Sequence, residues 1–451
     1  MTTTYDVRIN ETEIWKGKRT TTYYVRWTVD GRRRKQPFRL KALAESFRSE
    51  LLAAARKGEA FRVDTGRPVS MGRAATDVSW YDFACRYVDM KWKGAAATYR
   101  RAIAEALTTV TVALVDSQRG RPPEVEIRSA LFRWAFNSNL RDSADRPADV
   151  LLWVKRNSRL VSALADPATL RVVLSAIGSK LDGTPAAATV VNRKRMVLSN
   201  ALSYAVEQGV LATNPLGTLK WKPPKASHAV DRRAVPNPVQ ARTLLNALAD
   251  VQRSGPRLVA MFAAMYFGAL RPEEATNLTK SNLLLPEQGW GELHLEEATP
   301  HAGRGWTDSG AARDRRQLKH RAVGDGRAVP CPPELTELLH AHLDAFGTDG
   351  EGRLFRGERG GELPVVTIGR AWRAARARAF TAEVAAGPLA RRPYDLRHAA
   401  VSTWLNGGVP PAQVAEWAGH SVEVLLKVYA KCLDGQDEIA RRRVQEALGH
   451  R

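Results

Sequence analysis

The first clear pattern of apolar and polar positions lies near the N-terminus. Residues 20–29 (TTTYYVRWTV) alternate aromatic or β-branched residues with polar ones, which is the period of a half-buried β-strand. Asp30-Gly31 follows directly and is typical of a tight hairpin turn. The next segment, 32–40 (RRRKQPFRL), is then the return strand. The pattern predicts a β-hairpin whose second strand carries a run of cations.

A helical period follows the hairpin. Residues 41–58 end in Gly58, a residue type that commonly terminates helices, and their larger apolar side chains recur on one helical face. These side chains are Leu43, Phe47, Leu51 and Leu52. With the hairpin they predict a small β-sheet-plus-helix module over residues 1–70. Residues 62–78 contain Gly and Pro, show little periodicity and predict a linker.

A helical domain is predicted over residues 76–225. One helix begins after Ser79, a good N-cap, and 185–216 has the pattern of a long helix. The candidate packing positions of the long helix are Val191, Met196, Leu198, Leu202, Ala205 and Val206. Residues 220–238 are rich in Pro and Lys and predict a second linker.

The last predicted domain covers residues 235–451. It has helical patterns at both ends and two short strand patterns in its middle, 289–299 (GWGELHLEEAT) and 326–332 (GRAVPCP). We therefore expect a multidomain, mainly α chain with small β-sheets, an α+β class. No apolar run approaches the ~18 residues of a membrane span, and the N-terminus shows no secretory signal.

Charge and cysteine content narrow the class of function. The 451 residues carry a formal net charge of +22, with a pI of about 10.2. Such a surplus of cations favours a polyanionic partner, with nucleic acid as the best candidate, although a basic solvated surface is the ordinary alternative. Three cysteines far apart in the sequence favour neither a disulfide framework nor a zinc site, and they fit a reducing cytoplasm. We expect no cofactor and no metal.

Two basic clusters are candidates for contact with DNA. The first lies on the predicted return strand. The second lies at the start of the long helix, where backbone N–H groups suit phosphates. Each cluster could equally be exposed surface without a ligand. The candidates are Arg32, Arg33, Arg34, Lys35, Arg193, Lys194 and Arg195.

Two places in the last domain combine residues that can bind and protonate an anion. In GALRPEE, Arg271 follows a Gly turn, and Glu274 lies three residues later, where it can orient the guanidinium. Residues 315–332 (RRQLKHRAVGDGRAVPCP) predict a hairpin with Lys319 on or just before its first strand. Lys319 stands alone in a long stretch that otherwise uses arginine, which indicates a need for an ammonium that can release a proton.

Two further places are YDLRH and AGHSVEVLLKVY. Tyr394 lies three residues before Arg397 in the first, and His420 lies nine residues before Tyr429 in the second. On one continuous helix, nine residues would put the two side chains on opposite faces. Ser421 is a good N-cap, so a helix that starts after it would leave His420 in a turn and let the two side chains meet.

Each of these residues also has an ordinary structural interpretation. Arg271 and Arg397 fit surface ion pairs at helix starts, and His398 fits a packing residue. Tyr429 lies on an apolar helical stripe, so core packing is its default role. The other members of that stripe are Val422, Leu425 and Leu426.

In this order and spacing, the motifs resemble the tyrosine recombinase (phage integrase) family, and most closely integrases of actinobacterial phages and integrative elements. The resemblance covers roughly residues 240–435 and rests on GALRPEE, Lys319, YDLRH, AGH and Tyr429. The preceding helical domain and the N-terminal module look like that family's core-binding (SAM-like) and arm-binding domains. One residue departs from the family, which usually has histidine where this chain has Tyr394.

The resemblance implies a site-specific recombinase, or integrase, that cuts and rejoins DNA through a 3′-phosphotyrosyl intermediate and so integrates and excises a mobile element. Tyr429 would be the nucleophile, and Lys319 would protonate the leaving 5′ oxygen. Two arginines would bind the non-bridging oxygens, and His420 or a neighbouring group would take the tyrosine proton. The implied catalytic set is Arg271, Lys319, Tyr394, Arg397, His420 and Tyr429, supported by Glu274.

The resemblance also implies partners and a location. The partners are core and arm sites on double-stranded DNA, further copies of the chain in a tetramer on DNA, an excisionase and a DNA-bending host factor. The location is cytoplasmic and nucleoid-associated. Three alternatives stay open: a catalytically impaired DNA-binding relative, which only Tyr394 supports; a type IB topoisomerase-like strand transferase; and a helical transcription regulator, which would not need Lys319.

Overall fold

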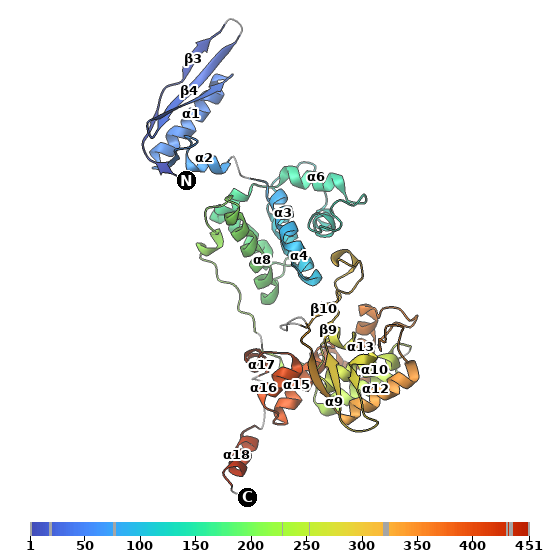
Figure 1. The fold of residues 1–451 in the computed structure, drawn as a ribbon. Helices are drawn as coiled ribbons and strands as arrows, with labels where there is room; N and C mark the ends of the chain where they lie inside the picture. Colours follow the sequence, from blue (N-terminus) through green and yellow to red (C-terminus); the bar gives the residue numbers. More distant parts are fainter. Residues whose placement is uncertain are drawn as a thin grey trace. The chain divides into compact units, whose positions relative to one another are not determined.

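The computed structural model describes residues 2–17, 20–74, 78–227, 229–251, 253–318, 324–429, 432 and 436–449. The chain forms two compact units. The first consists of residues 1–95 and 99–224, and the second of residues 96–98 and 225–451. Helices dominate and the sheets are small, which confirms the predicted multidomain α+β class (Figure 1).

The N-terminal part of the first unit is a small antiparallel sheet. Its strands are β2 (Val7–Ile9), β3 (Glu13–Lys16), β4 (Thr21–Val29) and β5 (Arg32–Phe38). β4 is central, with β5 along one edge and β2 and β3 along the other. Asp30 and Gly31 have φ angles of 52° and 72°, the left-handed pair that a type I′ hairpin turn requires. The predicted hairpin is therefore confirmed.

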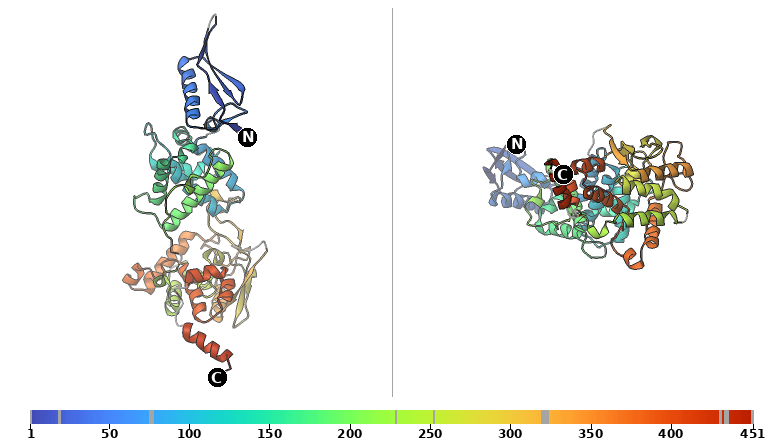
Figure 2. Two further views of the ribbon diagram at one scale, coloured as in Figure 1. Left: turned by 90° about the vertical axis from the view of Figure 1, so that its left-hand side faces the viewer. Right: turned by 90° about the horizontal axis from the view of Figure 1, so that it is seen from below.

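Helix α1 (Lys41–Arg56) lies along one face of this sheet (Figure 2). The core between them consists of Val25, Trp27, Val29, Ala44, Leu51, Ala54 and Phe61. Leu43, expected on the packing face, is 55% exposed. The buried stripe includes Ala44 instead, one residue or about 100° further round the helix.

The segment between the sheet and the helical domain has more structure than the predicted linker. β6 (Phe61–Arg62) pairs with β1 (Thr3–Thr4), and α2 (Val69–Ala74) follows. The interpretation of 62–78 as a bare linker is therefore wrong for these residues.

Helices build the rest of the first unit. They are α3 (Trp80–Trp92), α4 (Ala97–Ala113), α5 (Glu124–Ala130), α6 (Ala148–Asn157), α7 (Pro167–Gly178) and α8 (Ala188–Glu207), with short turns η1 (Leu131–Ala135), η2 (Val161–Ala165) and η3 (Pro215–Gly217). Ser79 caps α3 as predicted, because its hydroxyl accepts a hydrogen bond from the Asp82 N–H. Met196 was expected to pack but is 65% exposed, and its neighbour Val197 is buried instead.

The second unit has a helical core beside a small sheet. Its first helices are α9 (Pro238–Ala249), α10 (Gly255–Phe267), α12 (Pro333–Phe346), α13 (Val365–Ala379) and α15 (Asp395–Asn406), with the short α11 (Pro272–Ala275) and α14 (Ala382–Ala386) and the turns η4 (Arg232–Ala234), η5 (Lys280–Asn282) and η6 (Arg304–Trp306). α10 packs against α9, α12 and α15 (Figure 1). It is buried over most of its surface, which explains its almost continuous apolar sequence.

The strands of this unit pair differently from the sequence prediction. They are β7 (Leu283–Leu284), β8 (Gly291–Leu295), β9 (Glu297–Ala298), β10 (Arg316–Gln317) and β11 (Arg327–Cys331). β11 pairs with β8, and β10 pairs with β9. Among the described residues, the predicted hairpin over 315–332 is therefore wrong, because both of its arms pair with the earlier segment 291–298.

The C-terminal helices form a second, smaller core. They are α16 (Pro411–Ala418), α17 (Val422–Tyr429) and α18 (Gln436–Ala447). The core joins α15, α16 and α17, and its residues are Ala269, Ala400, Val401, Leu405, Val414, Ala415, Ala418, Leu425 and Tyr429. No helix in the described part of the chain is both long and apolar enough to cross a membrane.

Candidate active site

The turn between α16 and α17 answers the question raised by the nine-residue spacing. α16 ends at Ala418, and Ser421 caps α17 by accepting a hydrogen bond from the Val424 N–H at 3.2 Å. His420 lies in the turn, as predicted. Its ring stacks on that of Tyr429, with 6.1 Å between centroids. The break in the helix therefore brings the two side chains together.

Gly419 makes this turn possible in two ways. Its φ of 65° is left-handed, a conformation that costs other residues free energy. A Cβ atom at this position would also lie 2.3 Å from Nη1 of Arg327 and 3.3 Å from Nη1 of Arg271. The missing side chain thus lets two guanidiniums approach the backbone, and Arg271 donates a 2.7 Å hydrogen bond to the Gly419 carbonyl.

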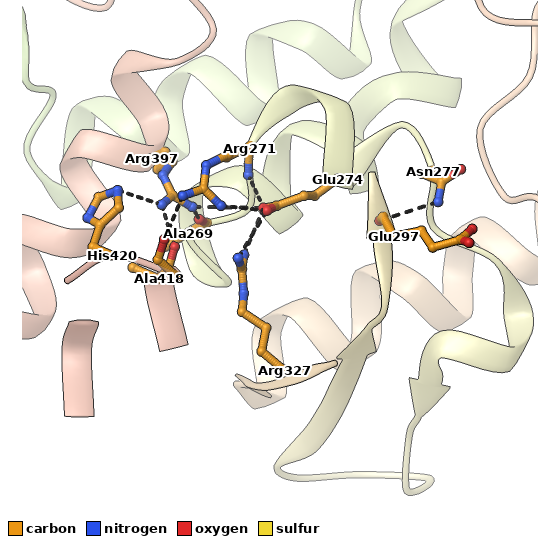
Figure 3. A network of polar contacts seen from close by, with 10 residues as sticks. Ala269, Arg271, Glu274, Asn277, Glu297, Arg327, Arg397, Ala418 and His420 are labelled. Atoms are coloured by element: carbon orange, nitrogen blue, oxygen red, sulfur yellow. Dashed lines mark hydrogen bonds and ion pairs between the residues drawn. The ribbon is translucent and has the colours of Figure 1, made fainter. Parts of the chain in front are cut away.

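The carboxylate of Glu274 lies between two of the arginines (Figure 3). Arg271 donates to it from Nη1 and from the backbone N–H, both at 2.7 Å. Arg327, at the start of β11, donates two further hydrogen bonds of 3.0 and 2.7 Å. The predicted pairing of Glu274 with Arg271 is present. Arg327 is a partner that the sequence analysis missed.

Electrostatics keep this cluster ionised. Burial alone would raise the pKa of Glu274, but Arg327, Arg271 and Arg397 outweigh it and hold the pKa at about 2. Burial would also lower the pKa of Arg271, but the Glu274 carboxylate outweighs it and raises that pKa above its ordinary value. The carboxylate therefore stabilises the charge of Arg271, whereas burial lowers the pKa of Arg327 and Arg397 below the ordinary value in spite of it.

Arg397 enters the cluster from α15 and is 0% exposed. Its guanidinium donates to the backbone carbonyls of Ala269 and Ala418, and from Nη2 to Nε2 of His420 at 2.9 Å. Ala269 has a φ of 50°, a strained conformation for a residue with a side chain. That conformation directs the Ala269 carbonyl toward the guanidinium of Arg397, so the strained backbone helps to position this side chain.

Three buried N–H groups of the cluster have no hydrogen-bond partner among the described residues: Nε of Arg327, Nε of Arg397 and Nδ1 of His420. Burial and the nearby Arg397, Arg271 and Arg327 lower the pKa of His420 to about 3, so the imidazole is neutral at pH 7. Because Nε2 accepts from Arg397, the ring hydrogen must lie on Nδ1. All three free groups are therefore donors.

The hydroxyl of Tyr429 meets a different histidine from the one expected. It lies 2.9 Å from Nδ1 of His398, which the sequence analysis treated as a packing residue. Tyr429 is 1% exposed, and burial raises the pKa of its hydroxyl. Burial also lowers the pKa of His398 to about 4. Both groups are therefore neutral near pH 7.

Tyr394 lies at the N-terminal end of α15 and, within the described part of the chain, makes no hydrogen bond to the arginine cluster. Its ring meets that of His398 edge to face, with 5.0 Å between centroids. Lys319 lies outside the described residues, so its predicted place near the cluster stays a prediction.

The predicted DNA-binding residues of the N-terminal sheet divide between its two faces. Arg34 points inward and donates to the carbonyls of Val63 and Asp64 at 2.8 and 2.9 Å. Arg33 and Lys35 alternate with it and are exposed, and Lys35 lies 3.6 Å over the ring of Tyr24. Arg32 is also exposed, at the turn.

The predicted cations of α8 have partners within the first unit. Arg193 donates to Glu105 at 2.8 Å, and Lys194 to Thr109 at 3.1 Å. Arg195 lies over the ring of Trp221 at 5.5 Å. Their role on DNA stays a prediction. Among the described residues, no cluster of three or more His, Cys, Asp or Glu side chains could hold a metal ion.

Arg327 and His398 are the two residues of the site that sequence analysis missed. The signal for His398 was its place directly after Arg397, inside the YDLRH motif. Arg327 offered no local signal, because it is one arginine among many and its carboxylate partner is 53 positions away.

No protein-family model and no curated protein matches this chain. Several solved structures do. A Tn1549 transposon integrase in complex with transposon right end DNA gives a TM-score of 0.49 at 16% identity, over 69% of this chain and 97% of that one. A XerH site-specific recombinase bound to palindromic difH substrate gives 0.44 at 13%, over 82% and 95%. A lambda integrase dimer bound to a COC′ core site gives 0.48 at 13%, over 90% and 91%.

These neighbours are tyrosine recombinases, the family that the sequence motifs resemble. Each TM-score lies below 0.5, so the likenesses carry no weight in assigning a function to the site.

Proposed function

We propose that this chain is a site-specific DNA recombinase of the tyrosine recombinase type, which cuts and rejoins DNA through a phosphotyrosyl bond at Tyr429. The observation that carries this proposal is the buried surplus of positive charge beside the tyrosine. Arg271, Arg327 and Arg397 surround one carboxylate, Glu274, and three N–H donors of the cluster have no partner among the residues that the structure describes. An uncompensated buried charge is costly, so the arrangement makes sense when an anion completes it.

A phosphodiester is an anion of the right kind. It brings one negative charge, and a second develops as a nucleophile adds to phosphorus. Arg271 and Arg397 then bind the two non-bridging oxygens, and Nδ1 of His420 donates to one of them. Glu274 and Arg327 hold Arg271 in place. Binding is strongest where the charge is greatest, which is at the transition state.

The reaction exchanges one phosphate ester for another. Oη of Tyr429 forms a bond to phosphorus, the bond from phosphorus to the 5′ oxygen breaks, and Lys319 protonates the leaving oxygen. A 3′-phosphotyrosyl bond and a free 5′-hydroxyl result. The energy of the phosphodiester is kept in the covalent bond, so rejoining needs no ATP. Ionising a phenol of ordinary pKa at pH 7 costs roughly 4 kcal/mol, so the tyrosine needs a proton acceptor.

DNA must rearrange this site before the reaction can begin. Tyr429 is 1% exposed, and the three arginines are also buried. A phosphate can reach them only after α17 or a neighbouring segment shifts. In the structure Arg271 and Arg397 donate to backbone carbonyls, and under the proposal phosphate oxygens take the place of these acceptors.

The N-terminal sheet is proposed as the reader of the arm sites. Arg26 and Thr28 of β4 alternate with the buried residues under α1 and so face away from the helix. Arg33 and Arg8 lie opposite Thr28 on the neighbouring strands, and Lys35 lies opposite Arg26. These exposed cations form one basic face. Together with the net charge of +22, it supports double-stranded DNA as the partner.

Several finer predictions rest on the sequence resemblance alone. They are the integration and excision of a mobile element, the tetramer on DNA, the excisionase, the DNA-bending host factor, and the nucleoid-associated location in the cytoplasm. A catalytically impaired relative is less favoured, because Arg271, Arg397, His420 and Tyr429 form one cluster even though Tyr394 replaces the usual histidine.

The test of the proposal is the Tyr429→Phe variant on a nicked suicide substrate carrying the element's junction sequence. We expect the natural chain to leave a protein–DNA adduct on a denaturing gel, and the variant to leave none while binding DNA with nearly unchanged affinity. An adduct in the variant would reject Tyr429 as the nucleophile. Relaxation of a supercoiled plasmid that lacks the junction would favour the topoisomerase-like alternative.

A further inference from the structure

We propose that His398 is the group that accepts the proton of Tyr429 during cleavage and returns it during rejoining, an inference that rests on the proposed function. The sequence resemblance leaves this position open, because Tyr394 stands where a histidine is usual. The proton acceptor therefore has to be found among the residues that touch the tyrosine.

The buried hydroxyl of Tyr429 indicates the direction of its hydrogen bond with His398. The two groups are 2.9 Å apart, and no other hydrogen-bond partner is recorded for the tyrosine hydroxyl among the described residues. The hydroxyl is buried, so its hydrogen needs an acceptor close by. A neutral imidazole offers one at Nδ1 when its own hydrogen is on Nε2. His398 is partly exposed, so that Nε2–H need not be satisfied inside the protein.

His420 cannot take the same role in this arrangement. Its Nε2 already accepts a hydrogen bond from Arg397, and its Nδ1 carries the hydrogen. It meets Tyr429 through ring stacking and not through a hydrogen bond. The two histidines therefore divide the work: His420 donates to the phosphate, and His398 accepts from the nucleophile.

The position of His398 also explains how the site can function with tyrosine in place of the usual histidine at position 394. Residues 394 and 398 are four apart at the start of α15, so their side chains lie on the same side of the helix. Their rings meet edge to face at 5.0 Å. Tyr394 thus packs against the imidazole that contacts the nucleophile. The resemblance leads one to expect an imidazole at position 394, and in this chain the imidazole of His398 lies one helical turn later.

The proton transfer balances as follows. Oη of Tyr429 bonds to phosphorus while the bond from phosphorus to the 5′ oxygen breaks. The phenol proton passes to Nδ1 of His398, whose ring becomes an imidazolium, and Lys319 gives a proton to the leaving 5′ oxygen. In rejoining, the 5′-hydroxyl attacks phosphorus and returns its proton to Lys319, and the imidazolium returns the other proton to Oη as the phosphotyrosyl bond breaks. The same group serves as base in one direction and as acid in the other.

The charged groups around His398 agree with this sequence of events. Burial is the largest effect and lowers the pKa of His398 to about 4; Asp395 raises it, and Arg392 and Arg397 lower it further. The imidazole is therefore neutral and able to accept at pH 7. Because burial also raises the pKa of Tyr429, the proton moves while the bond to phosphorus forms and not before. The charge of the bound phosphodiester then favours the imidazolium.

The first test is His398→Asn, which keeps an acceptor oxygen near the position of Nδ1 but cannot take up a proton. We expect the single-turnover rate of adduct formation on the suicide substrate to fall by roughly 10²-fold or more, with DNA affinity nearly unchanged. His340→Asn is the matched control, because His340 is also partly exposed and is hydrogen-bonded to the Pro286 carbonyl away from the cluster. Its rate should equal that of the natural chain.

Two further measurements separate proton transfer from a packing role. Replacing Tyr429 with 3,5-difluorotyrosine lowers the pKa of the nucleophilic hydroxyl, so its proton leaves more readily without a base. In the His398→Asn background this replacement should restore most of the lost rate, whereas a packing defect would persist. Tyr394→His in the same background should also restore part of the rate, because it returns an imidazole to the neighbouring position.

The outcomes distinguish this inference from the proposed function. If the natural chain forms an adduct at Tyr429 but His398→Asn forms it at the same rate, the inference is overturned and the proposed function stands. If the variant is slow and neither difluorotyrosine nor Tyr394→His restores it, His398 is a packing residue and the inference is again overturned. A natural chain that forms no adduct on the junction substrate overturns both.

Discussion

Two groups of arginines in this chain show how differently the same side chain can be used. Arg271, Arg327 and Arg397 are buried, share one carboxylate and contact the backbone. Arg8, Arg26 and Arg33 lie on the open face of the N-terminal sheet and are exposed to solvent. The first group is a buried cluster, and the second is a basic surface.

The difference teaches what each group can contribute. Buried charges interact strongly and depend on one another, so the loss of one member disturbs the rest. Exposed cations act almost independently, and salt screens them. A transition state is stabilised by fixed donors, whereas a DNA backbone can be bound by mobile ones. The five predictions that follow test this contrast, from the largest expected effect to the smallest.

The largest effect is expected for a cation of a third kind, Lys319, whose proposed role is to protonate the leaving oxygen. Lys319→Arg keeps the charge but removes a readily transferable proton, so cleavage should fall by roughly 10² to 10⁴ while DNA binding barely changes. On DNA with sulfur in place of the 5′ bridging oxygen, the leaving group needs no proton and most of the rate should return. Equal defects on both substrates would make Lys319 a phosphate-binding residue only.

The next effect concerns the carboxylate of the buried cluster. Glu274→Gln leaves three buried guanidiniums without a counter-charge, and we expect the unit to lose about 3–5 kcal/mol of stability in urea unfolding. Glu273→Gln is the matched control. Glu273 lies next to Glu274 in the sequence, is less buried and forms no ion pair among the described residues. If Glu274→Gln were as stable as the control, the three guanidiniums would not need the carboxylate as a counter-charge.

The same variant should change the pH dependence of stability. The folded pKa of Glu274, about 2, lies below its ordinary value of 4.5. Its contribution is therefore present above pH 4.5 and is lost as the pH falls toward 2. Glu274→Gln should therefore reduce the dependence of the unfolding free energy on pH in this window. An unchanged slope would show that the carboxylate is not specially stabilised in the folded state.

A smaller effect is expected at Gly419. Gly419→Ala imposes a left-handed φ of 65° on a residue with a side chain and brings Cβ to 2.3 Å from Arg327. We expect a loss of about 1–3 kcal/mol and a clear fall in cleavage, because the guanidinium must shift. Gly58→Ala has a similar φ of 70° and open space around it, so it reports the backbone cost alone. Equal losses would mean that the contact with Arg327 is unimportant.

The smallest effect belongs to the exposed face. Arg33→Gln should leave stability within about 0.5 kcal/mol of the natural chain and weaken arm-site binding slightly, with a salt slope reduced by about 1. Arg34→Gln, one residue later, should instead destabilise the module, because Arg34 donates to Val63 and Asp64. If the two variants behaved alike, the division of the strand into a binding face and a packing face would be wrong.

Local signals were enough to predict much of this fold. Asp30-Gly31 and the caps at Ser79 and Ser421 predicted their turns and helix starts, because each depends on a few neighbouring residues. The position of His420 in a turn before α17 followed from the same reasoning. Arg271 and Arg397 were also predicted, since their motifs are short and continuous, whereas Arg327 was not.

The errors come from contacts between distant segments. The arms of the predicted 315–332 hairpin pair with 291–298, which no local pattern reveals. His398 meets Tyr429 across 31 positions, and the helix period at Met196 fits packing equally well until the neighbouring elements are known. Tertiary partners, and not intrinsic preference, decide such cases.

The burial of Tyr429 matters to the host cell as much as to the reaction. Under the proposed function, a reactive hydroxyl on the surface of a basic protein would threaten every stretch of chromosome that the protein touched. In the structure that hydroxyl lies beneath packed side chains, so a chance collision with the double helix does not bring it into contact with a phosphate. Strand cleavage is then confined to DNA complexes in which α17 or a neighbouring segment moves. The packing of a small hydrophobic core thus also protects the chromosome from unwanted breaks.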